Sequence, residues 1–119
     1  MEQEDVAIRH LQLGAPDAFK VLFFQLYAEF FSFSTLLLQD GAAARQVTLG
    51  AFFLLWNRHA DFDCEKAIKA FLYIAIRNRC LRQIRGLPLS DNAGGRDAVP
   101  SSLPPDILRD ILSHTAKAV

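Results

Sequence analysis

Residues 16–39 read PDAFKVLFFQLYAEFFSFSTLLLQ, and this stretch decides the fold. Phe19 and Phe23 begin a series of large apolar side chains that recurs at spacings of three, four and seven residues. This is the period of an α-helix, which brings such residues onto one face. Pro16 and Asp17 suit a first turn, where a missing N–H is harmless and an acid complements the helix dipole. The spacing therefore predicts one long helix over residues 16–39.

The same apolar periodicity extends outward from this stretch in both directions. It predicts four further helices, over residues 4–13, 42–58, 64–85 and 105–117. Gly14 and the pair Asp40-Gly41 are interpreted as helix ends, with glycine available for the left-handed cap. Asp61 or Asp63 is expected to cap the helix that follows it. No segment has the pattern of a strand, so the expected fold class is all-α, a small helical bundle.

The composition fits one folded domain. The 119 residues are 51% hydrophobic and 22% charged, which argues against disorder of the whole chain. Ten phenylalanines are more than a small core hides, so some apolar surface is expected to face a partner. Cys64 and Cys80 are too few for a disulfide framework or a zinc cluster. The acidic N-terminus lacks a signal core, and the apolar run 47–56 is too short to span a bilayer, so we expect a cytoplasmic protein without membrane association.

The composition changes after Gly86. Prolines, the pair Gly94-Gly95 and small polar residues follow, which is typical of a linker. The chain is therefore divided into a helical domain over 1–86, a linker over 87–104 and a short C-terminal helix over 105–119. Whether this tail folds back onto the bundle is left open by the sequence.

Side chains with catalytic or metal-binding chemistry form no recognisable constellation. His10, His59 and His114 are scattered along the chain, without the spacing of a metal site. Cys80 lies in an arginine-rich turn that could lower its pKa, but no neighbouring residue supplies a matched base. We therefore expect no cofactor, no metal ion and a protein that is not an enzyme.

Charge is distributed unevenly along a chain whose formal net charge is zero. Residues 1–40 contain six acids and two bases, whereas residues 58–85 contain seven bases and three acids. Four side chains fall together on the side opposite the apolar stripe of the helix over 64–85: Lys66, Lys69, Tyr73 and Arg77. Cations neutralise phosphates, and an exposed aromatic ring can stack on an unpaired base. The strip therefore fits single-stranded or melting DNA, and an ordinary solvated helix face is the alternative.

Three segments share their order and spacing with a known family. Residues 71–81, FLYIAIRNRCL, are similar to the pattern LY-x-IARN-x-x-L, and residues 52–58, FFLLWNR, are similar to FLKLW-x-R. Residues 17–23, DAFKVLF, resemble the opening D-x-AF-x-x-L(F/Y). On these segments, residues 5–86 resemble region 2 of the extracytoplasmic-function (ECF) type of RNA polymerase sigma factor, in the sigma-70 family.

This resemblance implies a role in transcription initiation. Region 2 is a helical bundle that docks on the clamp helices of the polymerase β′ subunit and opens the promoter −10 element by capturing flipped bases. Carried over to this sequence, the DNA-binding residues are Lys66, Lys69, Tyr73, Arg77, Asn78 and Arg82. The polymerase-docking residues are Gln46, Leu49, Gly50 and Phe53. An anti-sigma factor and a second copy of the chain are further candidate partners.

The sequence departs from the family in two ways. The docking helix of the family usually reads AEDIVQEVF, whereas residues 44–52 read ARQVTLGAF, so that Gln46 and Gly50 replace acids and Leu49 replaces an amide. Polymerase docking is therefore in doubt, and a diverged interaction or dimerisation module that buries Leu49 and Phe53 is the alternative function. The C-terminal DNA-binding domain of the family is also missing. A truncated chain, a one-domain relative and a decayed copy all remain open.

Overall fold

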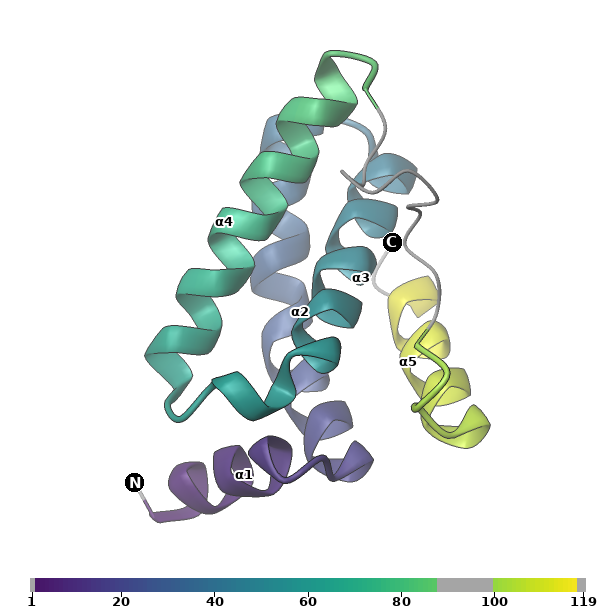
Figure 1. The fold of residues 1–119 in the computed structure, drawn as a ribbon. Coiled ribbons are helices and arrows are strands. Elements are labelled where there is room, and N and C mark those ends of the chain that lie inside the picture. The colour runs from purple at the N-terminus through teal and green to yellow at the C-terminus, as the bar shows by residue number, and fades with distance from the viewer. Residues whose placement is uncertain (1, 88–99, 118–119) are drawn as a thin grey trace.

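The computed structural model describes residues 2–87 and 100–117. Its helices are α1 (Glu2–Gln12), α2 (Pro16–Leu38), α3 (Gly41–Asn57), the short 3-10 helix η1 (His59–Asp61), α4 (Glu65–Ile84) and α5 (Pro105–Lys117) (Figure 1). The described residues contain no strand, so the all-α fold class is confirmed. Each of the five predicted α-helices is present, with ends within two residues of the prediction.

The core lies where α2, α3 and α4 meet. The rings of Phe23 on α2 and Phe52 on α3 are both fully buried and meet edge to face, with centroids 4.7 Å apart. α4 contributes Ile68, Leu72 and Ile76, which recur every fourth residue and are fully buried. These residues are the apolar stripe that the sequence predicted for this helix, because a spacing of four keeps side chains on one face.

α2 is also the longest and most apolar helix. Among the described residues it alone is long and apolar enough to cross a membrane, a criterion that the core helix of a soluble protein also meets. Seven of its side chains are buried in the bundle, from Phe19 to Ser34. Its outer side carries apolar residues that remain exposed, namely Val21, Phe24 and Leu36.

The C-terminal helix packs against the bundle. Leu103, Ile107 and Ile111 are buried in the same core as α2 and α3. Figure 1 shows α5 on the side of α2 and α3 away from α4. This arrangement answers the question that the sequence left open, because the tail from residue 100 onward folds back. Most of the predicted linker, residues 88–99, lies outside the described residues.

The junction between α2 and α3 differs from the prediction. Gln39, with φ of 54°, takes the left-handed conformation that was assigned to Gly41. The side chain of Asp40 caps α3 by accepting hydrogen bonds from the N–H groups of Ala42 and Ala43, at 3.0 and 3.2 Å. The Asp-Gly pair therefore starts α3 instead of ending α2, since an aspartate can satisfy free N–H groups at a helix start.

The other two predicted caps had opposite outcomes. Gly14 does end α1 in a left-handed conformation, with φ of 90°. A Cβ atom at this position would lie 3.1 Å from Cε1 of His59, so glycine also permits a close approach of α1 and η1. The prediction that Asp61 or Asp63 caps α4 was wrong, because Cys64 is the N-cap residue and makes no side-chain cap.

Candidate nucleic-acid interface

α4 presents its basic strip to solvent. Four of the six predicted DNA-binding residues are exposed: Lys66, Tyr73, Arg77 and Asn78. The other two, Lys69 and Arg82, are half-buried. Tyr73 is 39% exposed although its ring lies against Phe30 and Phe33, with centroids 4.6 and 5.1 Å away. The aromatic ring is thus held in place from one side and accessible from the other. The role of these residues in binding DNA stays a prediction.

An acidic residue of α2 holds two members of the strip. The hydroxyl group of Tyr73 donates a hydrogen bond of 2.7 Å to Glu29 Oε2. Lys69 Nζ lies 3.7 Å from Glu29 Oε1 and 3.5 Å from Glu65 Oε2. The hydrogen bond to Glu29, with smaller contributions from burial and from the charge of the carboxylate, raises the pKa of Tyr73. Sequence reasoning missed Glu29 because it is 44 residues away from Tyr73 in the chain.

Apolar side chains border the strip on its outer side. Ile74 on α4 is 59% exposed, and Leu81 and Ile84 are also exposed. Residues spaced by three, four or seven share one helix face, so Ile74 and Leu81 lie beside Arg77 and Asn78. This surface therefore offers apolar contacts for bases next to cations for phosphates.

Two consecutive residues in the second half of α4, Arg79 and Cys80, are buried in the bundle. Arg79, one of the seven bases counted in residues 58–85, has its pKa lowered to about 10 by burial. Cys80 is fully buried, and burial raises the pKa of its thiol, against the opposing effects of Ser34 and Arg79. Burial keeps Cys80 in its thiol form, as expected for a structural and not a reactive cysteine.

The predicted docking face on α3 is only partly exposed. Gln46 is exposed and Leu49 is half-buried, whereas Gly50 is buried and Phe53 is only 4% exposed. The sequence predicted Phe53 as a docking residue, which requires an accessible side chain, and for Phe53 this expectation of exposure is wrong. The helical wheel of α3 alone could not show which neighbouring elements pack on this side of the helix.

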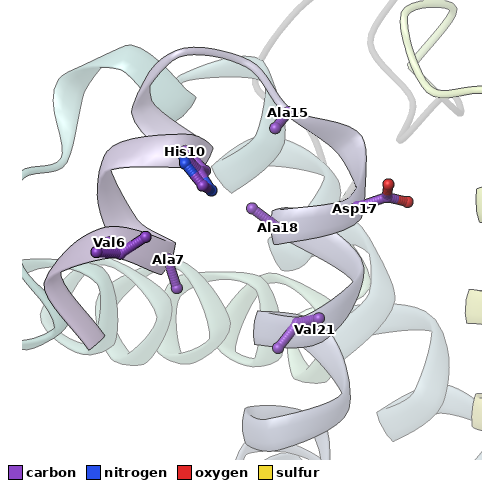
Figure 2. Close-up of a pocket in the computed structure, with 7 residues that line it drawn as sticks. All are labelled: Val6, Ala7, His10, Ala15, Asp17, Ala18 and Val21. Atoms are coloured by element: carbon purple, nitrogen blue, oxygen red, sulfur yellow. The ribbon is translucent and has the colours of Figure 1, made fainter. Parts of the chain in front are cut away.

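A groove lies between α1 and α2. It has a volume of about 580 Å³, and mostly alanine and valine side chains line it, together with His10 and Asp17. Figure 2 shows the carboxylate of Asp17 directed away from the imidazole of His10. These two residues therefore do not form an acid–base pair. Among the described residues, no group of three or more His, Cys, Asp or Glu side chains could hold a metal ion.

Comparison with known proteins yields no relative. No family model matches the chain, and neither a curated protein nor a solved structure matches it. The resemblance to sigma factor region 2 therefore rests on residues 17–23, 52–58 and 71–81. Any functional conclusion depends on those segments and on the geometry of α3 and α4.

Proposed function

We propose that this chain is a non-enzymatic, cytoplasmic transcription initiation module of the sigma factor type. It binds single-stranded promoter DNA of the −10 type through α4 and docks on core RNA polymerase through α3. One observation carries the proposal. Tyr73 is an accessible aromatic ring that lies between exposed cations, Lys66 and Arg77, on one outward side of a single helix.

This arrangement matches the chemistry of an unpaired DNA strand. A base can stack on an aromatic ring without regard to its sequence, and the contact contributes about 1–3 kcal/mol per base. The ring of Tyr73 is already fixed against Phe30 and Phe33, so little side-chain freedom is lost when a base stacks on it. Lys66 and Arg77 are separated by roughly 16 Å of helix, at 1.5 Å per residue, and can therefore contact phosphates on either side of that base.

Binding of a labelled single-stranded oligonucleotide with a −10-like sequence, measured across a range of salt concentrations, tests the DNA interface. We expect Arg77→Glu to weaken binding about tenfold or more and to reduce the slope of log affinity against log salt by about one or more. Arg109→Glu is the matched control, because Arg109 is an exposed arginine on α5. Equal losses in both variants, or an affinity that does not respond to salt, would contradict the proposal.

Retention on purified core polymerase tests the docking interface separately. We expect the polymerase to retain the full chain and Gln46→Leu to weaken this retention. A chain that binds DNA normally but never binds polymerase would limit the proposal to a DNA-binding module.

A second function is favoured by the apolar outer side of α2. Val21, Phe24 and Leu36 are large apolar residues that remain exposed in the single chain. Exposed apolar surface of this kind is typical of a protein–protein interface, so a dimer of two such helices is the alternative. Sedimentation distinguishes the two functions. The alternative requires a dimer that Leu36→Glu disrupts, whereas the leading proposal requires only a monomer.

A further inference from the structure

An acidic residue lies at the hydroxyl end of the Tyr73 ring. The Tyr73 hydroxyl group donates a hydrogen bond of 2.7 Å to Glu29 Oε2, and the Glu29 side chain remains 42% exposed. The ring itself lies against Phe30 and Phe33 and is accessible on its other side. A base that stacks on the accessible side and extends over the hydroxyl end of the ring therefore presents its edge to the Glu29 carboxylate.

This carboxylate has acceptor capacity left for a base. An ionised carboxylate offers about four lone-pair sites for hydrogen bonds and has no donor of its own. The Tyr73 hydroxyl group occupies one of these sites. Lys69 Nζ lies 3.7 Å from Glu29 Oε1, which is too far for a hydrogen bond. A group that binds Glu29 directly must therefore be a hydrogen-bond donor.

The local charge around Glu29 is negative in spite of the basic residue beside it. Lys69 is shared between two acids, because its Nζ atom also lies 3.5 Å from Glu65 Oε2. One cation between two carboxylates leaves an excess of one negative charge. This part of the strip therefore attracts donors and repels lone pairs, whereas Lys66 and Arg77, the exposed cations on either side, attract phosphates.

The pyrimidine bases differ in what they present to such an acceptor. Cytosine has the N4 amino group, which donates hydrogen bonds, and Glu and Asp are the side chains that accept from it. Thymine and uracil have the O4 carbonyl oxygen at the same place, and a carboxylate repels its lone pairs. Their N3–H group is a donor, but carbonyl oxygens flank it on both sides, so a carboxylate that approaches it meets them too. A carboxylate at the edge of the stacked base thus favours cytosine.

We propose that Glu29 is a specificity-determining residue of the strip, which selects a single strand with cytosine stacked on Tyr73 over one with thymine or uracil. This inference rests on the DNA-binding half of the proposed function. Stacking on Tyr73 alone makes no such choice, because every base has a π face. Glu29 therefore adds a preference between bases to a surface that otherwise binds any unpaired strand.

Binding of deoxycytidine and deoxyuridine homopolymers of equal length to the full chain tests the inference. Both bases are pyrimidines of nearly the same size and differ mainly on their pairing edge, whereas adenine, which also has an amino group, differs in stacking as well. The measurement is made at one salt concentration and at slightly alkaline pH, where cytosine is not protonated. We expect the wild-type chain to bind the cytosine strand about five- to tenfold more tightly than the uracil strand.

Two substitutions assign the preference to Glu29. Glu29→Gln replaces the carboxylate by an amide, which accepts through its oxygen and donates through its nitrogen and so can serve both bases. We expect this variant to bind the uracil strand more tightly than the wild type does, and the ratio of the two affinities to fall to about twofold or less. Glu65→Gln is the matched control, because it also removes an acid beside Lys69 but leaves the hydrogen bond between Glu29 and Tyr73 intact. In this control the preference for cytosine is retained.

The outcomes separate this inference from the proposed function. Equal affinity of the wild-type chain for the two strands, with binding that weakens as salt rises, overturns base selection and leaves DNA binding intact. An equal fall of the ratio in Glu29→Gln and Glu65→Gln overturns the specific role of Glu29, because the preference then follows the charge beside Lys69. Absence of binding to either strand overturns the DNA interface and base selection together.

Discussion

The two proposed binding surfaces differ in exposure: the surface on α4 faces solvent, whereas the surface on α3 is partly buried. On α4, Lys66, Tyr73 and Arg77 face solvent, and Glu29 and Glu65 supply the acidic contacts of the strip. On α3, Phe53 is buried and Leu49 lies across a groove from α5. One surface is therefore exposed along its length, whereas the other is exposed only in part, at Gln46 and Leu49.

The chemistry of each surface explains the difference. Charged side chains are well solvated, so a basic strip needs no cover in the free protein. An apolar face costs free energy in water in proportion to its area, so covering it stabilises the protein. The side of α3 that carries Leu49 and Phe53 is apolar, and Phe53 is almost completely buried.

The largest expected effect concerns this burial directly. Phe53→Ala should lower the free energy of unfolding by about 3–5 kcal/mol, because it removes a large buried side chain and leaves a cavity. Ile74→Ala is the matched change on α4, where the side chain is 59% exposed. Its effect should stay within about 0.5 kcal/mol. Urea unfolding of both variants measures the contrast.

Similar losses in the two variants would break the comparison. A loss below about 1 kcal/mol for Phe53→Ala would mean that the side chain is as free as one on the surface. The docking face around Phe53 would then be open in solution.

The sequence was most informative wherever a structural cause is local. The boundaries of α2 and α4 follow from the helical period and nearby helix-ending residues, and both were predicted closely. At the junction of α2 and α3, Asp40 fits either a helix end or a helix start, and the structure shows it as the N-cap of α3. Local pattern therefore predicts the helices better than it predicts their caps.

The errors and omissions at the candidate sites have causes that are distant in the chain. Phe53 was expected to be accessible because the helical wheel of α3 does not contain the neighbouring elements that bury it. Glu29 was overlooked because its contact with Tyr73 spans 44 residues. Arg79 was counted among the bases of residues 58–85 with no sign that it is buried. Such contacts depend on how the helices assemble, which a one-dimensional pattern does not contain.

A smaller effect, on DNA affinity, is expected from substituting Glu29 beside the α4 strip. Its carboxylate holds the Tyr73 hydroxyl and lies near Lys69, so a DNA phosphate must compete with it. Glu29→Gln should tighten binding of the single-stranded oligonucleotide by about two- to fivefold, the range expected for an exposed ion pair. Glu65→Gln is the control, since Glu65 bridges Lys69 without a hydrogen bond to Tyr73. Unchanged affinity for Glu29→Gln would show that Glu29 does not limit the strip.

The smallest expected effect is a shift in a tyrosine pKa. The chain has two tyrosines, and each reports on one of the two regions. Burial raises the pKa of Tyr27 to about 12, despite the opposing charge of Arg45, and its hydroxyl has no hydrogen-bond partner among the described residues. Tyr27 also lies 5.8 Å from the ring of His114 on α5, so it reports the covered side of the bundle. Tyr73, whose pKa is raised mainly by its hydrogen bond to Glu29, reports the open side.

An absorbance titration of tyrosinate should separate the two groups. In Glu29→Gln the pKa of Tyr73 should fall toward its ordinary value of 10, while that of Tyr27 stays at about 12. Because the folded-state pKa of Tyr27 lies above the unfolded value, its contribution to stability is complete below pH 10 and decreases as the pH rises toward 12. If both tyrosines of the wild type ionised together near pH 10, Tyr27 would be hydrated, and the side of the bundle beneath α5 would be as accessible as α4.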